Sequence, residues 1–325
     1  MVSVAMTTYN GEKYILDQLA SLHNQTMPPD EVVIFDDNST DNTVSLVRGF
    51  IEENQLDHWH LAVNSSNLGF VRNFYQAIDA TSGDYIFLCD QDDMWHADKI
   101  ERMVTIFLAH PDIYALNASF EKIDNDGAKL PFRARLGRSN CGLIKKVVKN
   151  GALVKIGLDS VLWRNISPGC TAAFTHACRE LFTRNRTGLC PHDWEINLFG
   201  AVMNGLYFYS EPLTEYRIHG DNTIGLVQLK AGQRLSAVLR DPRVAAAEVE
   251  YRRADAYLNS EWFSNLPISD QRMVRKLGRL TNKRMLALTK KKLSLWIALL
   301  FHLPDYWRWR GPQGILNDFH YITSK

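Results

Sequence analysis

Short apolar runs alternate with amphipathic helical patterns over the first 118 residues of the chain. Between the runs, apolar residues recur at spacings of three and four, which indicates helices with one buried face. Parallel strands need long connections, usually helices, so this alternation predicts a parallel sheet covered by helices. Ligands of such sheets bind beyond the carboxyl ends of the strands. The strand candidates are Val2–Met6, Glu31–Phe35, His60–Val63, Tyr85–Cys89 and Ile113–Ala118.

The remainder of the chain is less uniform. Residues 124–165 show no period and look like an insertion over the edge of the sheet, and regular patterns return from Ser167 to a strand candidate at Leu206–Tyr209. We therefore expect an α/β domain over residues 1–225 and a helical C-terminal region over residues 226–325. Four helical patterns separated by prolines make up the second region: 227–239, 244–263, 269–289 and 291–303.

Composition excludes several classes of protein. The 37 basic and 36 acidic residues leave a net charge of +1, which gives no reason to expect a nucleic-acid partner. Five scattered cysteines without a C-x-x-C pair argue against a disulfide framework or a zinc site, and favour a reducing compartment. The N-terminus runs directly into the apolar segment Val2–Met6, which is typical of a first strand and not of a signal peptide. We expect a cytoplasmic protein.

Three carboxylates lie within the four residues Asp90–Asp93, directly after the apolar run Tyr85–Cys89. Carboxylates so close together repel one another, whereas a divalent cation carrying a diphosphate would neutralise them. Mg²⁺ and Mn²⁺ suit oxygen ligands of this kind. The alternative is a solvated turn that caps the following helix.

A second acidic pair, Asp36 and Asp37, follows the strand candidate Glu31–Phe35. An acid in this position can hydrogen-bond a ribose or a base edge, as in dinucleotide-binding folds. Capping of the next helix is the alternative. The two acidic pairs at the ends of two strands reinforce each other as one site.

These motifs, in this order, resemble those of glycosyltransferase family 2, inverting enzymes with the GT-A fold. The resemblance covers about residues 1–225. The D-Q-D-D-x-W form is most similar to bacterial rhamnosyltransferase-type members that build cell-surface polysaccharides. The motifs are Thr7–Asn10, Asp36–Asp41, Asn67–Phe70 with Arg72 and Asn73, Gly83–Trp95, His192–Trp194 and Tyr216–Gly220.

The resemblance implies a role for each motif. One of Asp90 and Asp92 would reach the ribose or the metal through water, and the other would ligate Mn²⁺ or Mg²⁺, with His219 as a third ligand. Arg217 is a candidate phosphate contact. Asp93 departs from the minimal motif, and three roles stay open for it: a ligand, an acceptor for a sugar hydroxyl, or a helix cap. The nucleotide contacts implied are Thr8, Tyr9, Asn10, Asp36, Asp37, Arg72 and Asp90.

Inversion requires a base that takes the proton of the attacking acceptor hydroxyl. The resemblance places Asp193 in this role, at the start of a helix whose N-terminus would favour the ionised carboxylate. Its neighbours His192 and Glu195 are the rivals. Simple capping of the helix is the alternative for Asp193.

The C-terminal region carries Lys290–Lys292 before the apolar run 293–301, and the aromatic and basic segment Tyr306–Arg310 follows. An apolar run of this length is too short to span a bilayer. Basic residues beside Trp and Tyr suit a helix that lies in a membrane interface. Packing on the sheet domain or a contact between two copies of the chain is the alternative.

The expected function is transfer of rhamnose or a hexose, from dTDP-rhamnose or a UDP-sugar, to a hydroxyl of a growing cell-surface polysaccharide or a polyprenyl-linked glycan. Such an enzyme would work as a peripheral protein on the inner face of the plasma membrane. A nucleotidyltransferase would share the sheet and the metal, but the loop Thr7–Gly11 lacks the basic, Gly-rich pattern that holds a triphosphate. A non-catalytic, membrane-associated assembly partner is the third hypothesis.

Overall fold

The computed structural model describes residues 1–131, 137, 139–144, 147–220 and 242–324. The chain forms two compact units. The first contains Met1–Val161 and Asn165–Gln228, and the second contains Leu162–Arg164 and Leu229–Lys325. The domain boundary expected after residue 225 and the helix expected over residues 227–239 lie outside the described residues.

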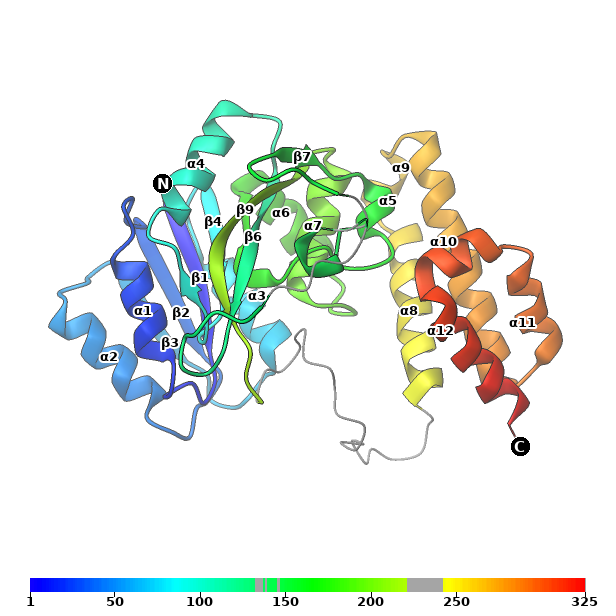
Figure 1. Ribbon diagram of the computed structural model, residues 1–325, viewed down its shortest axis with the longest axis horizontal. Helices are drawn as coiled ribbons and strands as arrows, with labels where there is room; N and C mark the ends of the chain where they lie inside the picture. The colour runs from blue at the N-terminus through cyan, green and yellow to red at the C-terminus, as the bar shows by residue number, and fades with distance from the viewer. Residues whose placement is uncertain (132–136, 138, 145–146, 221–241, 325) are drawn as a thin grey trace. The chain divides into compact units, whose positions relative to one another are not determined.

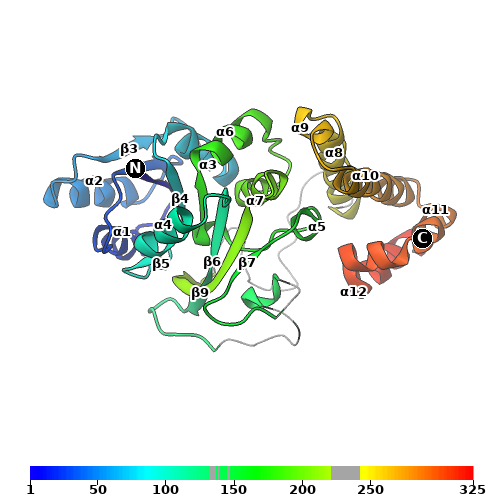
Figure 2. The same cartoon turned by 90° about the horizontal axis from the view of Figure 1, so that it is seen from above.

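The first unit is built on one mixed sheet, whose strands run in the order β3-β2-β1-β4-β8-β6-β9-β5, with β7 paired to β9 (Figure 1). Helices cover the sheet, with α1 and α4 on one side and α3 and α6 on the other in Figure 2. The strands are β1 (Val2–Thr8), β2 (Glu31–Asp36), β3 (Trp59–Val63), β4 (Tyr85–Cys89), β5 (Met94–Trp95), β6 (Ala115–Ile123), β7 (Leu153–Lys155), β8 (Ala172–Thr175) and β9 (Leu206–Arg217). The α-helices are α1 (Ile15–His23), α2 (Thr43–Glu53), α3 (Phe70–Ala80), α4 (Lys99–Ala109), α5 (Leu158–Val161), α6 (His176–Asn185) and α7 (His192–Val202), and the short 3₁₀ turns are η1 (Asn140–Gly142) and η2 (Gly169–Thr171).

Burial of the central strands on both faces explains the continuous apolar runs in their sequences. All seven residues of β1 are buried, as expected for a strand covered on both faces. Strands β1, β2, β3 and β4 are parallel, and Thr8 pairs with Asp36 while Met6 pairs with Cys89. The registers therefore bring the residues that follow β1, β2 and β4 to one edge of the sheet.

The parallel sheet predicted for the first 118 residues is confirmed in β1 to β4, and the sheet becomes mixed at β8. Strand β8, which sequence analysis did not identify, runs antiparallel to both β4 and β6. The chain reaches β8 through the irregular segment 124–165 and not through a crossover helix, so it can enter the sheet in the opposite direction. Beyond β8, strands β6 and β9 are again parallel to each other.

The second unit is helical, as predicted, but its helix boundaries differ. Gly311, with φ of 68°, kinks α12, and the pattern expected at 291–303 divides between α11 and α12. Arg284 is buried in this unit and forms ion pairs with Asp318 and Glu250 at 2.7 and 2.6 Å. No helix in the described residues is long and apolar enough to cross a membrane. The helices are α8 (Pro242–Leu258), α9 (Glu261–Ser264), α10 (Ile268–Thr289), α11 (Leu293–Leu300) and α12 (Leu303–Thr323).

Candidate active site

A cavity of about 870 Å³ lies at the carboxyl edge of the sheet in the first unit. Residues from several separate motifs line its wall, including β1, the turn after β4, the segment around η2 and the start of α7. Two predicted nucleotide contacts, Asp36 and Arg72, are absent from the lining. The predicted residues on the wall are Thr8, Tyr9, Asn10, Asp37, Asp90, Asp92, Asp193 and His219.

Gln91 joins the turn after β4 to the turn after β1. Its side chain accepts a hydrogen bond from the Tyr9 amide at 2.7 Å and donates one to the Tyr9 carbonyl at 2.9 Å. A Cβ at Gly11 would lie 2.3 Å from Oε1 of Gln91, so only glycine leaves room for this pairing. The two turns are thereby held together as one piece of the cavity wall, with the ring of Tyr9 46% exposed beside it.

Asp36 supports the wall from behind. Its carboxylate is fully buried and accepts hydrogen bonds from the Thr8 hydroxyl at 2.6 Å and from the Ser39 amide and hydroxyl at 2.7 and 2.6 Å. Asn10, at φ of 48°, accepts a hydrogen bond from the Thr40 amide. Asp36 is therefore placed to position Thr8 and the following turn. These hydrogen bonds favour a supporting role over direct contact with a nucleotide.

Asp37 holds the loop before α3. Its oxygens accept hydrogen bonds from the amides of Leu68 and Gly69 at 2.7 and 2.8 Å. Gly69 has φ of 82°, a conformation that favours glycine. Arg72, in the first turn of α3, lines a separate cavity of about 520 Å³ that shares Gly69 with the first.

The turn Asp90–Asp93 concentrates negative charge against the cavity. Burial, followed by repulsion from Asp93 and Asp92, raises the pKa of Asp90 well above its usual value. Asp92 is 17% exposed, and its Oδ2 lies 2.7 Å from Nε2 of His219, which is 9% exposed. Two carboxylates and an imidazole line the cavity, and donors of these types suit Mn²⁺ or Mg²⁺ together with phosphate oxygens.

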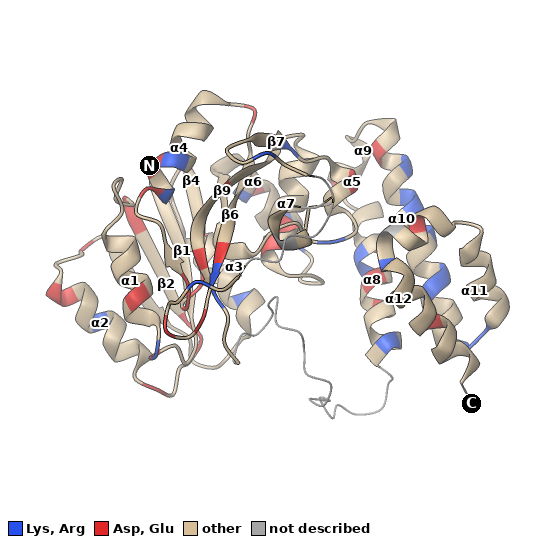
Figure 3. Ribbon diagram, in the orientation of Figure 1, with Lys and Arg blue, Asp and Glu red and all other residues tan. Residues whose placement is uncertain are grey.

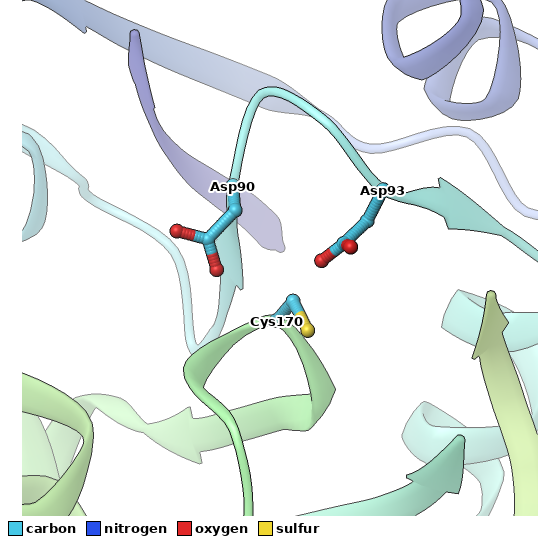
Figure 4. A group of neighbouring side chains, drawn as sticks. All are labelled: Asp90, Asp93 and Cys170. Carbon is cyan, nitrogen blue, oxygen red and sulfur yellow. The ribbon is translucent and has the colours of Figure 1, made fainter. Parts of the chain in front are cut away.

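Asp93 differs from the other two carboxylates because it turns away from the cavity. It is 1% exposed, and its Oδ1 accepts a hydrogen bond from the Arg217 amide at 2.9 Å. Figure 4 shows its carboxylate directed toward the side of Asp90, with Cys170 on the segment that faces the acidic turn. One oxygen of each acid and the Cys170 sulfur lie within 4.8 Å of one another.

This buried cluster has the chemistry of a proton-sharing group. Burial and then repulsion from Asp92 raise the pKa of Asp93 to about 7, against the opposing effect of hydrogen bonds from Cys170 and Arg217. Burial also raises the pKa of the Cys170 thiol, which therefore stays neutral and is a poor ligand for a hard cation. Helix α4 begins after Asp98, so Asp93 is not its cap. The structure favours a supporting role for Asp93.

Lys99 lies beneath the acidic turn and was missed in the sequence. It is completely buried, and its Nζ donates hydrogen bonds to the Cys170 carbonyl at 2.5 Å and the Thr214 hydroxyl at 3.0 Å. Burial lowers its pKa to about 8, although the nearby acidic groups, including Asp93 and Asp90, favour the charged form. This ammonium partly compensates the buried carboxylates.

Arg217 is a structural clamp, and it does not line the cavity. Its guanidinium donates to the backbone carbonyls of Asp92 and Asn125 at 2.8 and 3.0 Å, and its side chain is 2% exposed. The phosphate contact suggested for it in the sequence is not supported by this geometry. By fixing the end of β9 to the acidic turn, Arg217 brings His219 against Asp92.

Asp193 faces the same cavity from α7. It is 8% exposed, its Oδ2 accepts a hydrogen bond from Asn165 at 2.7 Å, and its Oδ1 accepts one from the Trp194 amide at 2.8 Å. Burial raises its pKa to about 6, because these hydrogen bonds offset the loss of water only in part. A carboxylate with this pKa is ionised at neutral pH yet accepts a proton more readily than an exposed aspartate.

Glu195 and His192, the other two candidates for the base, lie in surroundings that suit this role less well. Glu195 is completely buried and points away from the cavity lining, where it accepts hydrogen bonds from Tyr75 at 2.7 Å and from the Thr187 amide and hydroxyl at 2.8 and 2.6 Å. His192 lines the cavity but stacks on Phe74 at 3.8 Å between ring centroids. Burial lowers the pKa of His192 to about 3, so it is a weak base.

The fold is that of GT-A glycosyltransferases. TarS residues 1–349 of S. aureus, solved in complex with UDP-GlcNAc, superposes with a TM-score of 0.58 at 19% identity, covering 86% of this chain and 72% of that chain. The mannosyltransferase PcManGT of Pyrobaculum calidifontis, solved with GDP-Man and Mn²⁺, gives a TM-score of 0.50 at 18% identity, covering 99% and 84%.

The chain belongs to glycosyl transferase family 2, because the model of that family matches residues 3–167, about half of the sequence. A relative described as the dTDP-rhamnosyl transferase RfbG of Shigella flexneri is 29% identical over 253 residues, which cover 73% of this chain and 79% of that protein. An uncharacterised glycosyltransferase of Haemophilus influenzae is 26% identical over 254 residues, covering 74% and 72%. The family resemblance inferred from the motifs is confirmed.

Proposed function

We propose that this protein transfers a sugar, with inversion, from a nucleoside diphosphate donor to a hydroxyl of a cell-surface glycan. The observation that carries the proposal is that Asp193 lines the same cavity as Asp90, Asp92 and His219. The acidic turn and His219 could hold a diphosphate with its cation, and Asp193 could accept a proton. The comparisons favour neither a nucleotidyltransferase nor a non-catalytic partner.

The donor would bind against the turns joined by Gln91. The exposed ring of Tyr9 offers a stacking surface for the base, and Thr8 and Asn10 lie beside it on the cavity wall. Asp37 would act by holding the loop at Gly69. We propose dTDP-rhamnose or a UDP-hexose as donor, since the relative RfbG is described as a dTDP-rhamnosyl transferase and TarS was solved with UDP-GlcNAc.

Asp90, Asp92 and His219 would hold Mn²⁺ or Mg²⁺. The ion would stabilise the charge that develops on the leaving diphosphate. Arg217 and the hydrogen bond between His219 and Asp92 would hold two of these ligands in place before the donor binds.

Asp193 would take the proton of the acceptor hydroxyl as that oxygen attacks the anomeric carbon from the face opposite the diphosphate. Asn165 orients its carboxylate, and the N-terminus of α7 favours the ionised form. The proton ends on Asp193, the new glycosidic bond forms, and the bond to the diphosphate breaks. The acceptor would be a growing polysaccharide or a polyprenyl-linked glycan at the inner face of the plasma membrane.

A panel of nucleotide-sugars tests the proposal. We expect one donor, dTDP-rhamnose or a UDP-hexose, to raise the thermal midpoint of the protein only with Mn²⁺ or Mg²⁺, and the same donor to be hydrolysed slowly without acceptor. An Asp92→Asn variant, which keeps the shape of the wall, is the matched control and should lose the response to metal. If no nucleotide-sugar stabilises the protein in either condition, the proposal is wrong.

A further inference from the structure

Helix α11 and its flanks expose large apolar side chains. Leu293 and Ile297 are 42% and 45% exposed, and Phe301 at the end of the helix is 85% exposed. Residues spaced by four lie on one face of a helix, so these three side chains form a stripe. Leu303 and Trp307, in the first turns of the next helix α12, are also 42% and 54% exposed.

Positive charge borders this stripe. The exposed segment Lys290–Lys292 directly precedes α11, and Figure 3 shows basic residues in the connection between α10 and α11 and no charged residue within α11 itself. The one carboxylate in the sequence between residues 290 and 317 is Asp305, which is neutralised by an ion pair with Lys276. We call Lys290–Lys292 together with Leu293, Ile297 and Phe301 the α11 face.

We propose that the α11 face binds the surface of an anionic lipid bilayer. Lysines beside an apolar stripe attract acidic headgroups, while the apolar side chains enter the boundary between headgroups and acyl chains. Trp307 nearby is of the residue type that concentrates at this boundary. No described helix could span the bilayer, so the helix would lie in the interface plane. The inference goes beyond the proposed function, because lipid binding can be measured without any sugar transfer.

A second copy of the chain fits the α11 face less well. Stable protein interfaces bury roughly 800 Å² on each partner. Three side chains fall short of that area, since a fully buried aromatic contributes at most ~250 Å² and both Leu293 and Ile297 are smaller than an aromatic and less than half exposed. The bordering lysines meet no exposed carboxylate in this segment, whereas an anionic bilayer supplies the complementary charge over its whole surface.

Sedimentation with lipid vesicles tests the proposal on the full chain. We expect binding to vesicles rich in phosphatidylglycerol, little binding to pure phosphatidylcholine, and weakening by salt. Lys290→Gln with Lys292→Gln should weaken the partition about 25-fold, since each surface lysine contributes about five-fold. Ile297→Ser with Phe301→Ser should weaken it about ten-fold or more by removing the apolar stripe.

Leu108→Ser is the matched control, because Leu108 is 67% exposed on α4 and its removal should leave vesicle binding unchanged. Thermal midpoints with and without nucleotide-sugar, measured on the same samples, report folding and donor binding separately from lipid binding. Equal binding by the double variants and the wild-type protein would overturn the proposal. So would a dimer in solution that the Phe301→Ser change dissociates, with no vesicle binding, because the α11 face would then contact a second copy.

Discussion

Replacement of Asp193 by asparagine should make the protein more stable while abolishing transfer. Burial raises the pKa of Asp193 from its ordinary value of 3.8 to about 6. A shift of about two pKa units means that keeping this carboxylate ionised costs about 3 kcal/mol of folding free energy at neutral pH. Asparagine has no charge to desolvate.

The loss of one hydrogen bond in Asp193→Asn offsets part of this gain in folding free energy. Both oxygens of Asp193 accept hydrogen bonds, from Asn165 and from the Trp194 amide, and an asparagine can accept only one of them. The loss amounts to about 1 kcal/mol. The expected net gain is about 2 kcal/mol at pH 8, and the thermal midpoint of a unit of this size should rise by about 4–8 °C.

The sign of the pH dependence follows from the raised pKa. Between pH 3.8 and about 6 the folded protein holds a proton on Asp193 that the unfolded chain has lost, so the wild-type protein loses stability as pH rises through this window. The variant does not titrate there. Its advantage should therefore shrink from about 2 kcal/mol at pH 8 to about 0.5 kcal/mol at pH 5.

Glu195→Gln is the control that separates the proposed base from its buried neighbour. All the hydrogen bonds of Glu195 are made to Tyr75 and Thr187, so this change should lower stability by about 1 kcal/mol. Calorimetry at pH 5 and pH 8 measures both effects, and a transfer assay should show kcat reduced about 10²- to 10⁴-fold for Asp193→Asn. A destabilised Asp193→Asn protein at pH 8, or one whose kcat stays close to the wild-type value, would refute the reasoning.

Three further outcomes are expected from residues that line the cavity or lie beneath it. Asp92→Asn should remove the dependence of nucleotide affinity on Mn²⁺, measured by calorimetric titration with and without metal; an unchanged dependence would place the ligand elsewhere. Gly11→Ala should push the added Cβ into Gln91, break its pairing with Tyr9 and weaken donor binding about ten-fold by the same titration, and an unchanged affinity would contradict this role. Lys99→Met should lower stability by about 2 kcal/mol because two buried acceptors lose their donor, seen as a fall in thermal midpoint of roughly 4–8 °C, and a midpoint equal to the wild-type value would contradict it.

The strands and acidic turns were predictable because their signals are local. A fully buried strand such as β4 requires an uninterrupted apolar run, which is visible in the sequence. The acidic residues of the turn that follows are likewise visible without knowledge of their contacts. The family motifs then supplied Asp193, whose own surroundings in the sequence are equally typical of a helix cap.

The supporting residues were not predictable, because their roles depend on contacts between distant parts of the chain. Asn165 stands in a segment without any periodicity, yet it orients Asp193 across 28 positions of sequence. Lys99 occupies the expected start of a helix, where an exposed lysine is the ordinary interpretation. Strand β8 was missed because it is short and its direction follows from the path of segment 124–165.

The ammonium of Lys99 has a consequence for the order in which the site is assembled. Because Lys99 lies under the acidic turn and the neighbouring acids favour its charged form, the carboxylates above it do not depend wholly on an added ion for charge balance while the chain folds. If the proposed function holds, the polypeptide could reach its native arrangement first and acquire a metal and a donor afterwards. Supply of the metal would then limit how much enzyme is active at a given moment, and not how much of it survives in folded form.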